Sequence, residues 1–233
     1  MNRRQTFDVA IVGAGMVGAA LALKLARENF DVAVIESRAA APWLASDDVD
    51  LRVVALAPSS VDALADIGVW NTIASARACP YRRMHVWDAL APGDLTFDSA
   101  DSGAAALGHI VENRLIQHAL WQALNADARV VVQCPARVAS TDVDGERRVV
   151  VLDDGSRIAA RLVVAADGGE SALRELVGIA TRERDYAQRA VVAHVATQRP
   201  HEFTAWQRFL PDATLAFLPL ADGRSFAITS GVG

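Results

Sequence analysis

Hydrophobic and polar positions follow three distinct patterns at the start of the chain. Residues 7–12 are apolar apart from Asp8, which is typical of a strand buried on both faces of a parallel sheet. The alanine-rich stretch that follows, to about Asn29, has its leucines spaced for one face of a helix. Residues 31–36 form a second apolar run that ends at Glu36. Strand, helix and strand in this order predict a βαβ unit.

The pattern between this unit and residue 128 is less regular and predicts short elements joined by loops. The helix over 111–125 is the clearest of them, because its apolar residues recur at helical spacing. The other expected elements are a loop over 37–50, a helix capped by Ser59 and closed by Gly68 after Ile67, short strands over 82–98 around Pro92-Gly93, and a turn over 99–103.

Strand-like runs follow one another from residue 129 onward. We interpret the stretch 129–165 as a run of antiparallel strands, since Asp-Gly pairs of the kind found in hairpins separate the later ones. It ends at Asp167-Gly168, and a short helix over 170–177 and further strands after Ala190 follow. The expected strands cover 129–133, 136–142, 147–152 and 157–165, with turns at Asp144-Gly145, Asp154-Gly155, Pro211-Asp212 and Asp222-Gly223.

Candidate chemistry first appears at the turn between the first strand and the first helix. Gly13, Gly15 and Gly18 have the spacing of a dinucleotide-binding fingerprint, directly after a buried strand. Gly13 permits the tight turn, Gly15 lets the backbone approach a pyrophosphate, and Gly18 lets the helix pack closely. The free N–H groups of the helix would bind the phosphates, and Glu36 would accept hydrogen bonds from ribose hydroxyls. The alternative is a βαβ unit that binds nothing, but strand, spacing, helix and acid all agree on a nucleotide.

The fingerprint alone does not separate FAD from NAD. A simple NAD dehydrogenase would continue with alternating strands and helices, whereas this chain places its antiparallel run before a second glycine-bearing turn at Gly168. Such an order is typical of a glutathione-reductase-type FAD-binding domain. The fold class we predict is therefore α/β, with a Rossmann-like parallel sheet, an antiparallel insert and part of a mixed-sheet substrate domain.

Composition and charge narrow the classes of function. The chain has 23 Lys and Arg against 28 Asp and Glu, a formal net charge of −5, so nothing indicates a nucleic-acid partner. Cys79 and Cys134 lie far apart in the sequence, which favours free thiols over a disulfide or a zinc site. The five histidines lack metal-ligand spacing, so we predict no metal. Neither a signal peptide nor a spanning segment is recognisable, and we expect a cytoplasmic protein.

Three stretches together resemble the flavin monooxygenases that hydroxylate aromatic rings. They are the unit from Gly13 to Glu36, Asp50-Leu51-Arg52 with Ala55-Leu56, and Ala166-Asp167-Gly168 with Ser171 and Arg174. Within that class, Val111-Glu112-Asn113-Arg114-Leu115 and the stretches 205–211 and 215–220 are similar to ubiquinone-biosynthesis hydroxylases of the UbiH/UbiF/VisC type. The resemblance covers nearly the whole chain.

The resemblance implies roles for further residues. Arg52 would lie near the pyrophosphate or the flavin ring, and Arg114 would contact the cofactor. Asp167 and Gly168 would support the pyrophosphate region, and Arg174 would help to accept NAD(P)H. On local grounds alone Arg52 and Arg114 would be ordinary surface or helix-pairing residues, and Arg174 would cap its helix. On the same grounds Asp167-Gly168 is equally a turn or a ligand contact. The implied cofactor-binding set is Gly13, Gly15, Gly18, Glu36, Arg52, Arg114, Asp167, Gly168 and Arg174.

The activity implied is that of an FAD-dependent oxidoreductase, a monooxygenase using NADH or NADPH and O2 to hydroxylate a polyprenylphenol of ubiquinone biosynthesis. No acid–base pair is required, so we assign no catalytic side chain. Trp206 and Phe209 are either cavity-lining or ordinary sheet core. The lipophilic substrate implies peripheral contact with the inner membrane or a biosynthetic complex. The implied domains are 5–78 with 107–182 for FAD binding and 79–106 with 183–233 for substrate binding.

Family members continue through a second flavin motif and a terminal helical region, so we expect a C-terminally truncated chain. Two alternatives stay open. One is another FAD enzyme on the same scaffold, such as a halogenase, a prenyl reductase or a hydroxylase of soluble phenols. The other is a non-catalytic fragment that keeps the fold and has lost the chemistry.

Overall fold

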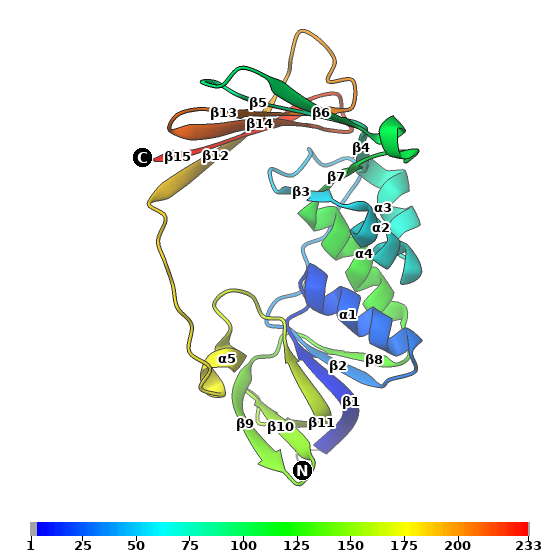
Figure 1. Cartoon of the computed structure of the whole chain (residues 1–233). Helices are drawn as coiled ribbons and strands as arrows, with labels where there is room; N and C mark the ends of the chain where they lie inside the picture. Colours follow the sequence, from blue (N-terminus) through cyan, green and yellow to red (C-terminus); the bar gives the residue numbers. More distant parts are fainter. Residues whose placement is uncertain (1–3, 233) are drawn as a thin grey trace. The chain divides into compact units, whose positions relative to one another are not determined.

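The computed structural model describes residues 4–232 and divides the chain into two compact units (Figure 1). Unit 1 comprises residues 1–42 and 116–182, and unit 2 comprises 43–115 and 183–233, as far as these are described. Each unit is therefore assembled from two separate stretches of chain. The predicted domain boundaries, near 78, 106 and 182, stay a prediction.

Unit 1 is built on a six-stranded sheet in the order β8-β2-β1-β11-β10-β9. Helix α1 packs against β2, β1 and β8 (Figure 1), because its buried alanines and Leu23 present a smooth apolar face to the sheet. The predicted βαβ unit is confirmed. The elements are β1 (Arg4–Val12), α1 (Met16–Arg27), β2 (Val32–Ile35), β8 (Val130–Gln133), β9 (Val138–Asp144), β10 (Arg147–Leu152), β11 (Arg157–Ala165) and α5 (Ala172–Leu176).

The prediction that 129–165 is an antiparallel run is wrong for β8 and holds for only one of the two neighbours of β11. β8 pairs in parallel with β2, and β11 pairs in parallel with β1 along its whole length. β9, β10 and β11 do form an antiparallel run, in which β10 pairs with both of the others. The two Asp-Gly turns predicted within this stretch are confirmed, with Gly145 at φ +61° and Gly155 at φ +81°. Local turn signals identify the hairpins, whereas the pairing of β8 and β11 depends on partners far away in the sequence.

Unit 2 contains a six-stranded sheet in the order β12-β15-β14-β13-β5-β6 and a three-stranded sheet in the order β3-β7-β4. Their cores meet where Cys79 and Ile110 of the small sheet pack with Phe226 of the large one. The strands are β3 (Val53–Leu56), β4 (Cys79–Tyr81), β5 (Arg83–Asp88), β6 (Asp94–Asp98), β7 (Gly108–Glu112), β12 (Gln188–Val195), β13 (Thr204–Phe209), β14 (Ala213–Pro219) and β15 (Ser225–Val232), and the helices are α2 (Pro58–Asp66), α3 (Trp70–Arg77), η1 (Ser99–Ser102, a 3₁₀ turn) and α4 (Asn113–Ala126, shared with unit 1).

Two helix starts differ from prediction. α2 begins at Pro58, whose fixed φ suits the first helical position, so its N-cap is Ala57 rather than Ser59. α4 begins at Asn113, because the apolar residues before it belong to strand β7. The predicted helix over 111–125 wrongly included the end of this strand. Helix α3 and the strands of the small sheet have no counterpart in the predicted elements.

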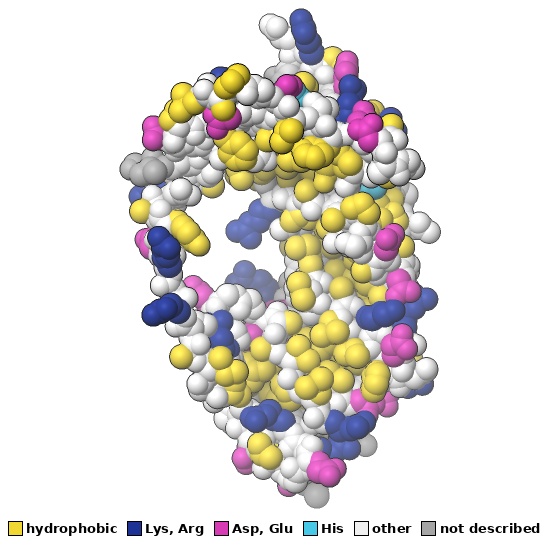
Figure 2. All heavy atoms as spheres, viewed as in Figure 1, with side chains coloured by type: hydrophobic (Ala, Val, Ile, Leu, Met, Phe, Trp, Pro, Cys, Tyr) yellow, Lys and Arg dark blue, Asp and Glu magenta, His cyan; other side chains and the backbone are white. Residues whose placement is uncertain are grey.

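Large hydrophobic side chains remain exposed on the six-stranded sheet of unit 2. Leu95 and Phe97 of the edge strand β6 are 62% and 51% exposed. Figure 2 shows hydrophobic side chains gathered over this sheet. In the described part of the chain, no helix has the length and apolar character needed to cross a membrane.

Candidate functional site

The glycine turn of unit 1 is as tight as its sequence predicts. Gly13 has φ +102°, in the region that favours glycine, and a Cβ there would collide with the carbonyl of Ala166 at the end of β11. A Cβ on Gly18 would collide with the carbonyl of Gly13, so α1 packs directly against the turn. Both glycines are thus required by close backbone packing.

Gly15 has a different environment. A Cβ on Gly15 would meet nothing within 4 Å among the described residues, and Gly15 is the N-cap of α1 without a side-chain cap. The indole Nε1–H of Trp121 donates to the carbonyl of Ala14 at 2.9 Å and fixes this turn from α4. The first N–H groups of α1 therefore face a cradle that a phosphate can enter, and this geometry fits the pyrophosphate of FAD.

Glu36 places its carboxylate against the same turn. Its Oε2 accepts from the backbone N–H of Ala14 at 2.7 Å, and its Oε1 accepts from Arg38 N–H at 3.0 Å and Ser37 Oγ at 3.1 Å. A carboxylate has about four acceptor positions, so capacity for a ribose hydroxyl remains. The acid predicted to bind a ribose therefore lies in direct contact with the glycine turn.

Asp167 lies beside that turn, where β11 ends next to β1 and Ala166 N–H donates to the carbonyl of Val12 at 2.7 Å. Its carboxylate accepts from Ser171 Oγ at 2.5 Å and from Leu173 N–H at 3.2 Å, and so holds the start of α5. Gly168 has φ +93°. Arg174 is half-buried on α5, with its backbone N–H donating to Ser171 Oγ. The contacts of Asp167 are those of a capping residue.

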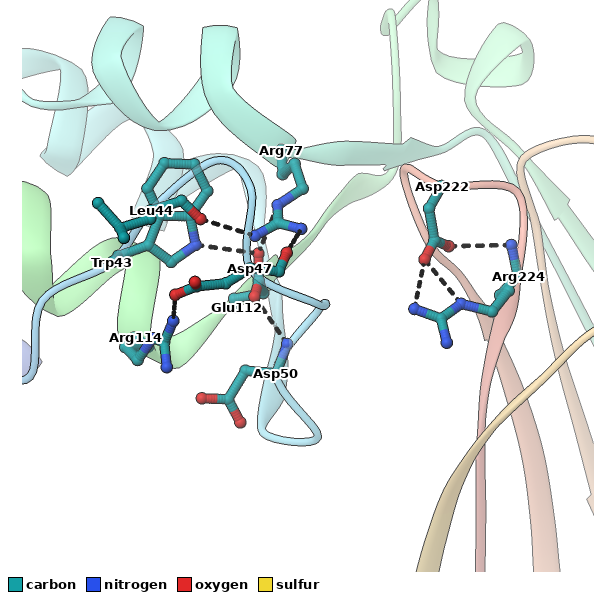
Figure 3. A network of polar contacts seen from close by, with 9 residues as sticks. All are labelled: Trp43, Leu44, Asp47, Asp50, Arg77, Glu112, Arg114, Asp222 and Arg224. Atoms are coloured by element: carbon teal, nitrogen blue, oxygen red, sulfur yellow. Dashed lines mark hydrogen bonds and ion pairs between the residues drawn. The ribbon is translucent and has the colours of Figure 1, made fainter.

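The two predicted arginines of unit 2 lie close to one another at the start of α4. Arg52 is exposed, and its carbonyl accepts from Asn113 N–H at 2.9 Å. Arg114 forms an ion pair with Asp47 through Nη2 (Figure 3). The Nε of Arg114 is buried and has no hydrogen-bond partner among the described residues. A buried donor of this kind is costly to leave unpaired, and it fits a phosphate or carbonyl acceptor of the cofactor.

Four polar residues around these arginines were not among the predicted site residues. Figure 3 shows them as one network of ion pairs and hydrogen bonds from three segments of unit 2. Only Glu112 carried a signal in the sequence, as an acid directly after the apolar pair Ile110-Val111. The residues are Trp43, Asp47, Arg77 and Glu112.

Two thiols and one histidine elsewhere have pKa values shifted toward their neutral forms. Burial, with a contribution from the charge of Asp222, raises the pKa of Cys79 to about 11. Burial and then the charge of Glu36 raise the pKa of Cys134, and burial lowers the pKa of His109. Neither thiol is a ready nucleophile at neutral pH. Within residues 4–232 no group of His, Cys, Asp and Glu is arranged to hold a metal ion.

Trp206 and Phe209 do not line one cavity together. Trp206 pairs with His85 and Phe217 across the sheet, and Phe209 is three positions further along β13. Since successive side chains of a strand alternate between faces, these two aromatic residues point to opposite sides of the sheet.

Comparison with known proteins supports the interpretation as a flavoprotein. Residues 6–230 match the family model described as FAD binding domain. The chain is 38% identical to 3-demethoxyubiquinol 3-hydroxylase of Escherichia coli (strain K12), over 94% of this chain and 56% of that protein. It is 35% identical to ubiquinone hydroxylase UbiL of Rhodospirillum rubrum and 34% identical to human ubiquinone biosynthesis monooxygenase COQ6, covering 50% and 51% of them. The chain thus spans about half the length of the curated relatives it matches.

Solved structures agree on the fold. Pseudomonas aeruginosa PqsL in complex with 2-aminobenzoylacetate superposes with a TM-score of 0.81 at 21% identity, over 98% of this chain and 61% of that one. Klebsiella pneumoniae HpxO complexed with FAD and uric acid superposes with a TM-score of 0.72 at 20% identity, over 96% and 56%. The predicted fold class and the predicted similarity to ubiquinone-biosynthesis hydroxylases are both confirmed. On its sequence, its glycine turn and its fold, this chain belongs to the FAD binding domain family.

Proposed function

We propose that this chain supplies the FAD-binding turn and part of the substrate domain of a monooxygenase that hydroxylates an aromatic ring, with NAD(P)H and O2 as co-substrates. One observation carries the proposal: the carboxylate of Glu36 is 2.7 Å from the N–H of Ala14, at the open N-terminus of α1. A ribose and a pyrophosphate need these two groups side by side.

The residues of this chain would bind and orient the cofactor. Gly13, Gly15 and Gly18 would admit the pyrophosphate, Glu36 would bind the ribose, and Asp167 with Gly168 would support the turn. In the proposed scheme Arg52 and Arg114 would also contact the cofactor, and Arg174 would help to accept NAD(P)H. Bound FAD would supply the redox chemistry that transfers one oxygen atom of O2 to the ring.

The proposed substrate is a polyprenylphenol of ubiquinone biosynthesis. Support comes from the relatives, whose names are those of ubiquinone-pathway hydroxylases and monooxygenases. The exposed apolar side chains of β6 and its sheet suit a lipophilic ligand. Such a substrate resides in a membrane, so we also propose a cytoplasmic protein with peripheral contact at the inner membrane or with a biosynthetic complex.

The first test is a titration of the purified chain with FAD, followed by flavin absorbance and fluorescence. Glu36→Ala is expected to weaken binding about tenfold, because it removes the ribose acceptor. Glu146→Ala is the matched control, since Glu146 is exposed in the hairpin between β9 and β10. Equal affinities of the wild type and Glu36→Ala would contradict the proposed site.

The second test addresses the reaction. The protein is supplied with FAD, NADPH, O2 and a short-chain prenylphenol, and products are analysed by mass spectrometry. A product that gains one oxygen atom from labelled O2 supports the proposal. Consumption of NADPH and O2 without an oxygenated prenylphenol would exclude this substrate class.

A further inference from the structure

Glu112 is an acid buried in the core of unit 2. Its side chain is 2% exposed at the end of β7, where Val53 of β3 is its cross-strand partner. A carboxylate in such a place is costly unless charge and hydrogen bonds compensate it. Here both are present: Oε2 accepts from Asp50 N–H at 2.7 Å, and Oε1 accepts from the indole N–H of Trp43 at 3.3 Å.

Arg77, the last residue of α3, supplies the opposite charge. Its Nε lies 3.0 Å from Oε1 of Glu112, as an ion pair without hydrogen-bond alignment. Its Nη1 donates to the carbonyl of Asp47 at 2.7 Å, and its guanidinium lies over the ring of Trp43 at 4.9 Å. Arg77 therefore joins the buried acid to the backbone of a loop.

The loop is the segment 43–52, which contains neither helix nor strand. Its backbone is tied to the Glu112–Arg77 pair at Asp47 and at Asp50. Backbone groups that lack regular secondary structure need such partners when they are packed against a core. The pair thus determines the conformation of a loop that carries both Asp47 and Arg52.

Asp47 links the segment 43–52 to Arg114. Its carboxylate pairs with Nη2 of Arg114, while Nε of the same guanidinium is buried without a partner among the described residues. We propose that Glu112 is a positioning residue for the cofactor: with Arg77 it fixes the segment 43–52, so that Asp47 holds Arg114 in the orientation that FAD requires. The inference rests on the proposed function, since it assumes that Arg114 contacts FAD.

The first measurement needs no cofactor. Hydrogen exchange of the chain is followed by mass spectrometry for wild type, Glu112→Gln and the control Glu146→Gln. Glu112→Gln is expected to speed exchange in the segment 43–52 about tenfold or more, while β1 of unit 1 keeps its protection. The control is expected to match the wild type in both segments. Unchanged exchange in 43–52 would overturn the anchoring role.

The second measurement is a double-mutant cycle on FAD affinity. Glu112→Gln and Arg114→Gln are each expected to weaken FAD binding about tenfold, and the double variant to bind within about twofold of Arg114→Gln alone. Such non-additivity is the signature of a residue that acts through Arg114. Asp47→Asn breaks the link without touching the buried pair, so it is expected to weaken FAD binding while leaving the urea midpoint unchanged.

Two results would count against these expectations in different ways. In the first, the wild type binds FAD, but the losses of affinity in Glu112→Gln and Arg114→Gln add fully in the double variant. This result would overturn the positioning role alone. A folded wild-type chain with no measurable affinity for FAD would overturn the proposed cofactor site, and the positioning role with it.

Discussion

In each unit a glutamate and a tryptophan make hydrogen bonds at a loop, but the two glutamates are used differently. In unit 1, Glu36 accepts from the N–H of Ala14, and Trp121 donates to the carbonyl of that same residue. In unit 2, Glu112 accepts from the N–H of a loop residue and from the indole of Trp43. The first carboxylate is partly exposed, whereas the second is buried against an arginine.

We interpret this difference as that between a carboxylate proposed to bind a ligand and one proposed to fix a loop. A ligand-binding acid must keep an unused acceptor position and access to solvent. If protein groups occupied all of its acceptor positions, it could not bind the ligand. An acid that only fixes backbone is most effective when it is buried and fully compensated. Glu36 meets the first description and Glu112 the second, although both lie at the end of a strand, before a loop or helix.

The largest effect is expected from Glu112→Ala, which leaves Arg77 charged and without its carboxylate partner. Unfolding in urea should show a loss of about 3–5 kcal/mol, the usual cost of breaking a buried ion pair from one side. The double variant Glu112→Leu with Arg77→Met removes both charges and should lose clearly less. If the double variant loses as much free energy of unfolding as Glu112→Ala or more, the unpaired charge of Arg77 is not the cause of the destabilisation.

Gly18→Ala is expected to rank second. Its Cβ would enter the carbonyl of Gly13, so the helix must shift away from the turn. Overpacking of this kind costs about 1–3 kcal/mol, measured as the urea midpoint. FAD affinity should fall in parallel. A Gly18→Ala chain with wild-type stability and affinity would contradict the packing of α1 on the turn.

Gly15→Ala should separate binding from stability. The added methyl group meets no described atom within 4 Å, so we expect a stability change within about 0.5 kcal/mol. The same methyl group would lie where the pyrophosphate approaches, so FAD affinity should drop about tenfold. Loss of stability without loss of affinity would place the phosphate elsewhere.

The smallest effect concerns the buried thiol of unit 2. Because the pKa of Cys79 is raised to about 11, the thiol of the folded chain stays neutral when that of the unfolded chain has already ionised. Stability from this group is therefore complete below the ordinary pKa and is lost as the pH rises toward 11. Cys79→Ala should remove this part of the alkaline decline in the urea midpoint. An identical decline in wild type and variant would assign it to other groups.

The glycine turn was predictable because everything it needs is local. Strand, Gly13, helix and Glu36 follow one another at fixed offsets, and the structure joins them as expected. The Asp-Gly hairpins of unit 1 were predictable for the same reason. Such features depend on a few neighbouring residues, whose conformational preferences are strong.

The network of Glu112 could not be predicted in this way. Its partner Asp50 lies in the predicted loop, but Arg77 belongs to α3, a helix that the pattern of apolar residues did not reveal. The parallel pairings of β8 with β2 and of β11 with β1 were not predicted either, because the two strands of each pair lie far apart in the sequence. The roles of Arg52, Arg114 and Arg174 still rest on resemblance.

The position of β15 in its sheet has a consequence for synthesis of the chain on the ribosome. β15 pairs with β12 on one side and β14 on the other, so it joins the two parts of the sheet. Until Ser225–Val232 has left the exit tunnel, β12 has no partner and β14 exposes an open edge. Such an edge is prone to wrong pairing, and we expect a chaperone to shield it during this interval.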